Sequence, residues 1–220
     1  MLVAEKVEML CIAGRPNPIY PTLLFDNQDV ILIDAGYPGQ CKLFEQALLP
    51  LGYGLFDITK VIITHQDFDH IGIVNDLKRI NPRVETYAHI EEAPYIDGRR
   101  MPIKLQKRLK EFDSLPLDMQ EYTKIQQKWY ETTPFKIDHL LFGEEELPFC
   151  GGLKVLHIPG HTPGHIALLL KSGNILVGGD GFSIIDEEIA PPAAEHTQDM
   201  DRALNSLIPL SKEKIDGVVS

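Results

Sequence analysis

The first third of the chain alternates short apolar runs with turn residues, a pattern typical of β-strands. Apolar runs over 22–26 and 30–36 flank the turn residues 27–29 and predict a hairpin. The helical spacing of apolar residues over 41–52 predicts a helix that ends at a glycine. Residues 60–64 are apolar and β-branched without alternation, as expected for a strand buried on both faces.

The rest of the chain continues this alternation, except for one helical stretch. Residues 91–134 read as two amphipathic helices bounded by prolines. The other expected elements are a helix over 69–79, strands over 84–89 and 153–159, a hairpin over 165–180, a helix over 200–207 and a last strand over 215–220. Strands mixed with helices, without repeats or a linker, predict one layered α/β domain over 1–220 with a helical insertion at about 91–134.

Polar residues recur where the predicted strands end. Asp34 closes one strand, His65 follows the next, and His161 and Asp180 follow two later strands. Strand ends hold side chains rigidly while the adjoining loops adapt, so such residues often meet in one site.

The hexapeptide HQDFDH at 65–70 concentrates these residue types. Singly, Asp34 could cap a turn, Asp69 could cap a helix, and His161 and His165 could form loop hydrogen bonds. Two histidines and two aspartates in six positions, with His161 and Asp180 at other strand ends, favour a metal site instead. Imidazoles and carboxylates without a thiolate suit zinc, manganese or iron. The remaining histidines are expected to be surface or packed residues: His89, His139, His157 and His196.

Composition narrows the classes of function. The formal net charge of −11 argues against non-specific nucleic-acid binding, which depends on lysine and arginine. Three widely spaced cysteines indicate reduced thiols rather than a disulfide framework. The sequence shows no secretory signal and no stretch of the ~20 apolar residues needed to span a bilayer. We therefore expect a cytoplasmic protein that acts on a small molecule, without a nucleic-acid or membrane partner; a homodimer is left open.

In this order along the chain, the segments LIDAG, HQDFDH, PGHTPGH and GGD resemble the motifs of the metallo-β-lactamase fold superfamily. Its signature is H-x-H-x-D-H, then a distant His, a bridging Asp and a last His. The resemblance implies a four-layer αββα sandwich with two divalent metal ions at one edge of two facing sheets. It implies that Asp34 and His165 orient the ligands and that Asp69 and Asp180 serve catalysis. The implied ligands are His65, Asp67 and His161 for one metal, and Asp69 and His70 for the other, with Asp180 bridging.

Two features depart from that signature. Asp67 stands where the superfamily has its second His, which adds negative charge and shifts preference from zinc towards iron or manganese without excluding zinc. The flavodiiron branch, which holds two irons, has a carboxylate at the same position. The last His is absent up to Ser220, and we expect it to lie just beyond the sequence shown; otherwise the second metal has one ligand fewer.

The leading hypothesis is a hydrolase of a small ester, thioester or lactone, resembling lactonases or glyoxalase II. Two cations, zinc first, would lower the pKa of water towards ~7 and supply a nucleophilic hydroxide at neutral pH. The insertion could cover the cleft with its aromatic residues; a packed helical pair without substrate contact is the alternative. Those aromatic residues are Tyr95, Tyr122, Trp129 and Tyr130.

Three other functions stay open. A diiron centre that reduces oxygen or nitric oxide would explain Asp67, but the chain has no room for the flavodoxin-like domain that usually supplies electrons. A phosphodiesterase of the same superfamily conflicts with the charge of −11 and the absence of a basic run. A binding module with a degenerate site would hold no metal.

Overall fold

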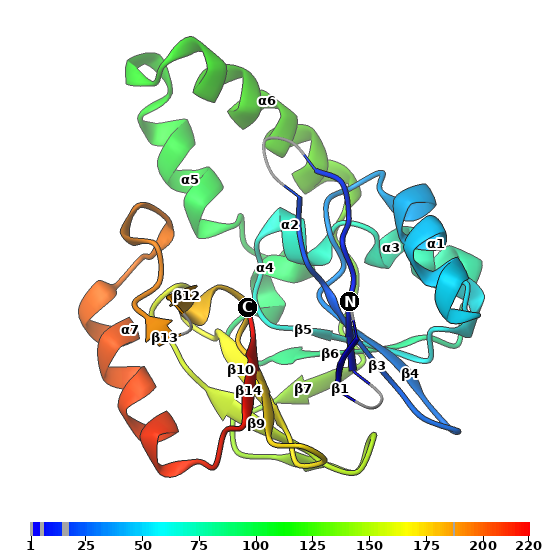
Figure 1. Cartoon of the computed structure of the whole chain (residues 1–220). Coiled ribbons are helices and arrows are strands. Elements are labelled where there is room, and N and C mark those ends of the chain that lie inside the picture. The colour runs from blue at the N-terminus through cyan, green and yellow to red at the C-terminus, as the bar shows by residue number, and fades with distance from the viewer. Residues whose placement is uncertain (1, 5–6, 15–17, 187) are drawn as a thin grey trace.

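The computed structural model describes residues 2–4, 7–14, 18–186 and 188–220. The strands of these residues form two large sheets and one short hairpin (Figure 1). The first sheet runs in chain order through β1 (Leu2–Ala4), β2 (Val7–Met9), β3 (Thr22–Phe25), β4 (Val30–Ile33), β5 (Lys60–Ile63), β6 (Glu85–His89) and β7 (His139–Leu141). Neighbouring strands are antiparallel from β1 to β4 and parallel from β4 to β7.

The second sheet has a crossover in its strand order. It contains β14 (Gly217–Val219), β11 (Ile175–Val177), β10 (Ile166–Leu170), β9 (Leu153–His157) and β8 (Glu146–Leu147), in that spatial order. The last strand, β14, pairs in parallel with β11, while the other pairs are antiparallel. A separate hairpin joins β12 (Ser183–Ile185) and β13 (Glu188–Ala190).

The α-helices follow β4, β5, β6 and β13 along the chain. The α-helices are α1 (Cys41–Leu48), α2 (Phe68–Ile71), α3 (Val74–Ile80), α4 (Ala93–Ile96), α5 (Ile103–Lys110), α6 (Leu117–Thr132) and α7 (Met200–Leu207). Short 3-10 turns occupy Leu49–Leu51, Leu55–Asp57, Phe112–Ser114, Gly179–Gly181, Ala194–His196 and Ile208–Lys212. Among the described residues, no helix combines the length and apolar character that crossing a bilayer requires.

Alternate side chains of the central strands build separate cores. On β4, Ile31 and Ile33 belong to a core shared with the second sheet, whereas Leu32 belongs to the core shared with α1 and α3. On β10, Leu168 joins the core between the sheets, and Leu169 joins a third core with the segment after α7. Because successive residues of a strand point to opposite faces, three cores separate four layers. The predicted αββα sandwich is confirmed.

The helix expected over 69–79 is interrupted at Gly72, so that α2 and α3 are separate. A β-carbon on Gly72 would overlap the carbonyl carbon of Tyr37 and the carbonyl oxygen of Gly36. Only glycine allows this backbone approach. The contact anchors the segment that follows the histidine and aspartate cluster against the turn after β4.

The insertion divides its aromatic residues between two roles. Figure 1 shows α5 and α6 as a pair of helices that extends beyond the sheets. Trp129 and Tyr130 pack against the core under the first sheet, whereas Tyr122 lines a cavity beside the predicted metal ligands. The sequence leaves a cap and a packed helical pair open as alternatives, and the insertion combines features of both.

Candidate functional site

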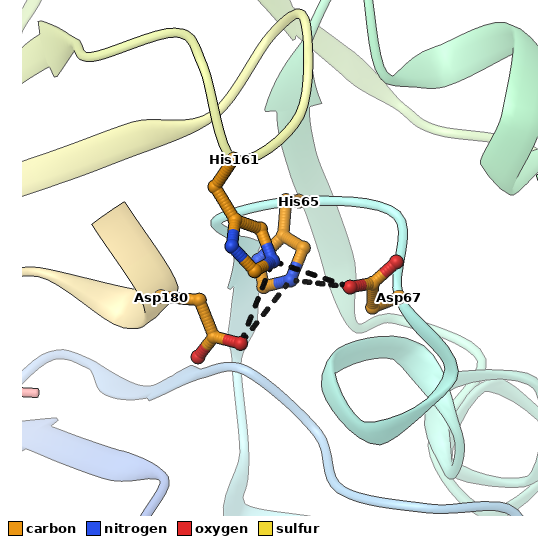
Figure 2. A group of neighbouring side chains, drawn as sticks. All are labelled: His65, Asp67, His161 and Asp180. Atoms are coloured by element: carbon orange, nitrogen blue, oxygen red, sulfur yellow. Dashed lines mark hydrogen bonds and ion pairs between the residues drawn. The ribbon is translucent and has the colours of Figure 1, made fainter. Parts of the chain in front are cut away.

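Four of the predicted ligands meet at one edge of the two sheets (Figure 2). His65 and Asp67 lie between β5 and α2, His161 lies in the loop after β9, and Asp180 lies in the turn after β11. One ligand atom from each lies within 4.8 Å of the others. Segments about a hundred residues apart therefore deliver imidazoles and carboxylates to a single point.

The geometry of this group suits a bound cation. Asp67 Oδ2 lies 3.3 Å from both His65 Nε2 and His161 Nε2, and Asp180 Oδ2 lies 3.5 Å from His161 Nε2. Burial lowers the pKa of His65 to about 4, so its imidazole is neutral at pH 7. His65 Nε2 is buried without a hydrogen bond to any described residue. A neutral, unpartnered nitrogen beside two carboxylates is the donor set that a divalent metal requires.

His70 and Asp69 stand on the other side of Asp180. His70 Nε2 lies 3.4 Å from Asp180 Oδ1 and 3.8 Å from Asp69 Oδ2. Asp180 therefore presents one oxygen to His65 and His161 and the other to His70. The bridging role of Asp180 and a second metal held by Asp69 and His70 stay predictions.

Asp34 connects β5 to His70. Its Oδ1 accepts the backbone N–H of Thr64 at 2.8 Å, and its Oδ2 accepts the Thr64 hydroxyl and His70 Nδ1, each at 2.8 Å. When His70 is neutral, this bond fixes the proton on Nδ1 and leaves the Nε2 lone pair facing Asp69 and Asp180. Although burial alone would lower the pKa of His70, the carboxylates of Asp34, Asp180 and Asp69 raise it well above its usual value.

Asp34 adopts a left-handed backbone conformation, with φ of 62°. Such a conformation is uncommon for a residue with a side chain and is often found at functional sites. It directs the carboxylate back onto Thr64 and His70, as the orienting role of Asp34 requires.

His165 lies beneath the same group. Its Nε2 accepts the backbone N–H of Asp180 at 3.1 Å, and its ring centroid lies 4.9 Å from that of His65. Burial, followed by the neighbouring imidazoles of His65 and His161, holds the pKa of His165 well below its usual value. A neutral His165 therefore positions the turn that carries Asp180, in line with the orienting role predicted for it.

Lys104 of α5 is a contact that the sequence analysis did not predict. Its ammonium forms an ion pair with Asp67 and donates to His161 Nε2 at 2.8 Å. Burial would raise the pKa of Asp67, but Lys104 and then the nearby imidazoles of His161 and His65 hold it well below its usual range. Asp67 is therefore ionised, as expected, and the insertion supplies a cation beside it.

Glu92 is a second residue that sequence reasoning missed. Its Oε2 accepts the backbone N–H and the side-chain amide of Gln66 at 2.8 and 3.0 Å, and its Oε1 accepts the N–H of Gly164 at 2.7 Å. Glu92 is fully buried, and burial raises its pKa to about 7 despite these amides. One carboxylate thus ties the loop of His65 and Asp67 to the loop of His161.

Another group of ligand-type side chains lies outside this edge: His89, Glu91 and His157, with ligand atoms within 4.8 Å of one another. The sequence predicts that both histidines are surface or packed residues, and their grouping with a carboxylate was not predicted. The two imidazoles stack with centroids 4.1 Å apart and planes inclined by 19°. Because a ring nitrogen's lone pair lies in the ring plane, stacked rings aim their lone pairs side by side rather than at one ion. The two histidines therefore remain packing residues.

A cavity of about 510 Å³ opens onto the candidate metal ligands. Its lining includes Asp67, Asp69 and Asp180 from the ligand loops and side chains of α5 and α6. The lining from the helices includes Lys104, Leu105, Arg108, Asp118, Met119, Tyr122 and Gln126. The cavity volume is typical of small-molecule sites.

Comparison with known proteins agrees with this arrangement. Residues 14–219 match the model of the metallo-beta-lactamase superfamily. The chain is 28% identical to the probable metallo-hydrolase YflN of Bacillus subtilis, over 89% of this chain and 75% of YflN. It is 24% identical to hydroxyacylglutathione hydrolase GloC of Haemophilus influenzae, over 70% of this chain and 62% of GloC.

Solved structures share the fold. The metallo-beta-lactamase family protein TTHA1429 from Thermus thermophilus superposes with a TM-score of 0.73 at 21% identity, covering 96% of this chain and 71% of TTHA1429. Since the family model spans nearly the whole chain and the motifs, the layers and the clustered ligands agree with it, the chain belongs to the metallo-beta-lactamase superfamily.

Proposed function

We propose that this chain is a metal-dependent hydrolase of a small thioester, ester or lactone. The observation that carries the proposal is the position of Asp180 between two sets of donors, at the end of a cavity large enough for a small acyl compound. The resemblance to GloC, named a hydroxyacylglutathione hydrolase, favours thioesters among these substrates.

Two metal ions suit the donor sets. His65, Asp67 and His161 would hold one ion, Asp69 and His70 the other, and Asp180 would contact both. Bound divalent metals lower the pKa of water and polarise a carbonyl oxygen. Zinc is the first candidate because imidazoles and carboxylates both bind it, and iron or manganese would also accept these ligands.

The chain's own residues would orient the reactants. Asp69 lines the cavity beside Asp180 and is placed to hold a water molecule and accept its proton. The water oxygen forms a bond to the carbonyl carbon, the C–S or C–O bond breaks, and the departing thiolate or alkoxide takes up the proton. Leu105 and Met119 supply an apolar wall that limits access of other water molecules.

The contact between Lys104 and Asp67 weakens the argument for a diiron redox centre. That hypothesis rested on the extra negative charge of Asp67, and Lys104 offsets this charge. Four aspartates line the cavity, which also disfavours a phosphodiester: Asp67, Asp69, Asp118 and Asp180.

The proposal is tested with purified protein loaded separately with zinc, manganese or iron. Each form is assayed on matched panels of thioesters, lactones and phosphodiesters, and for oxygen consumption with a chemical reductant. We expect zinc-supported cleavage of thioesters or lactones that a chelator abolishes and zinc restores. Oxygen reduction by the iron form without hydrolysis by any form would overturn the proposal, as would cleavage of phosphodiesters alone.

A further inference from the structure

Arg108 differs from the other cation of the cavity. Lys104 forms an ion pair with Asp67, whereas Arg108 forms no ion pair with a carboxylate of any described residue. The guanidinium instead donates from Nη1 to Gln126 Oε1 at 2.6 Å and lies 5.4 Å from the ring centroid of Tyr122. In a chain with a net charge of −11, a half-buried guanidinium held by neutral groups is an unusual arrangement.

The neutral contacts fix the orientation of Arg108 without neutralising it. Gln126 is buried and takes one N–H, and the face of Tyr122 supports the planar group. A guanidinium has five N–H donors, so donors remain for a bidentate partner. A pre-oriented cation of this kind binds an anion with little loss of conformational entropy.

The cavity that Arg108 lines also borders the candidate metal ligands. Tyr37, Tyr122 and Asp69 line it as well. Arg108 and Asp69 therefore face the same cavity. A substrate whose carbonyl lies at Asp69 would extend its other end towards Arg108.

From these contacts we infer that Arg108 binds a carboxylate at the non-reacting end of the substrate. The inference rests on the proposed hydrolase function and narrows its substrate to an acyl compound that carries an acid group. Four aspartates line the same cavity and would repel a phosphate dianion more strongly than a carboxylate monoanion.

Binding of uncleavable analogues tests the inference independently of catalysis. The probes are thioethers that replace the carbonyl by a methylene: the S-butyl derivatives of 3-mercaptopropionate, 2-mercaptoethylphosphonate and N-acetylcysteamine. Calorimetry with the zinc-loaded protein should show the carboxylate binding roughly 10- to 100-fold more tightly than the neutral amide, the usual value of a charge-assisted bond. Equal affinities for the carboxylate and the neutral amide would overturn the inference. Tightest binding of the phosphonate would also overturn it, because the site would then prefer a phosphate-type anion.

Arg108→Gln should remove this preference. The matched control is Lys107→Gln, which removes one positive charge from an exposed position of the same helix. Arg108→Lys keeps the positive charge but loses the paired N–H donors of the guanidinium, so we expect an intermediate preference for the carboxylate. Unchanged metal content would show that each variant is folded, and an equal loss of preference in Lys107→Gln would show a general charge effect and contradict the inference.

Kinetics separates this inference from the proposed function. With butyryl thioesters of 3-mercaptopropionate and N-acetylcysteamine, Arg108→Gln should raise KM about tenfold or more for the acid only. Thioester cleavage without any preference for the acid would support the hydrolase function and contradict the role inferred for Arg108. Carboxylate binding without cleavage of any substrate would support the anion site at Arg108 and contradict the proposed hydrolase function.

Discussion

The loops that carry the candidate metal ligands and the helical insertion both line one cavity and differ in chemistry. The ligand loops contribute imidazoles and carboxylates, held by buried partners such as Asp34, His165 and Glu92. The insertion contributes the cations Lys104 and Arg108 and a phenol, on half-buried helices. We propose a division of labour that follows this difference, in which the loops retain the metal and the insertion selects the substrate.

The largest expected effect comes from Asp180→Asn, since this carboxylate contacts both sets of donors. We expect the variant to lose metal from both positions and to lose activity beyond the roughly 100-fold cost of removing an outer partner. Metal analysis after gel filtration, with hydrolysis rates, measures both losses. Full metal content in the variant would show that Asp180 is not shared.

Glu92→Gln should weaken metal binding by roughly 10- to 100-fold, as for other partners that orient ligands. A carboxylate accepts N–H groups from both loops, whereas an amide must set its own N–H against one of them. Competition with a fluorescent zinc chelator measures the affinity. The control is Glu91→Gln, which changes an exposed neighbour and should leave zinc affinity as in the parent. Equal zinc affinities in all three proteins would contradict the role of Glu92 in joining the two loops.

Gly72→Ala tests how rigidly the ligand loop is held. A β-carbon here would overlap the backbone of Tyr37, so we expect a loss of about 1–3 kcal/mol in the free energy of unfolding. Urea unfolding measures this loss. Lys107→Ala on the insertion is the comparison, with an expected change within about 0.5 kcal/mol. Similar losses of stability in Gly72→Ala and Lys107→Ala would contradict the view that the ligand loop is held more rigidly than the insertion.

The pH dependence of stability should reveal the raised pKa of Glu92. Its pKa is about 7 in the folded chain and 4.5 as the ordinary value, so the folded state binds more protons between these two pH values. The contribution of Glu92 to stability therefore falls as pH rises from 4.5 to about 7. Urea unfolding of metal-free protein at about pH 5 and about pH 7.5 should show this fall in the parent and a smaller one in Glu92→Gln. Identical pH trends would contradict the shifted pKa.

Sequence reasoning reached the layers and the candidate ligands because local patterns encode them. Short apolar runs placed β4, β5 and β11, and the residues that follow these strands, Asp34, His65 and Asp180, then share one edge of the sheets. The break at Gly72 was missed, because its cause is contact with a turn more than thirty residues earlier.

Lys104, Glu92 and Arg108 could not be identified in the same way. Lys104 is one of several basic residues on α5, and nothing in its neighbours marks it as the one that reaches Asp67, 37 positions earlier. Glu92 follows another glutamate and gains its role from burial between two loops. Such contacts depend on how the insertion packs, which the periodicity of a single chain does not encode.

The most direct test of this division of labour is the metal content of three proteins purified in parallel with zinc: the parent, Asp67→Ala and Arg108→Gln. Mass spectrometry under native conditions counts ions per chain. We predict two zinc ions in the parent and in Arg108→Gln, and the loss of most of one equivalent in Asp67→Ala. Unchanged zinc in Asp67→Ala, or its loss in Arg108→Gln, would contradict the account.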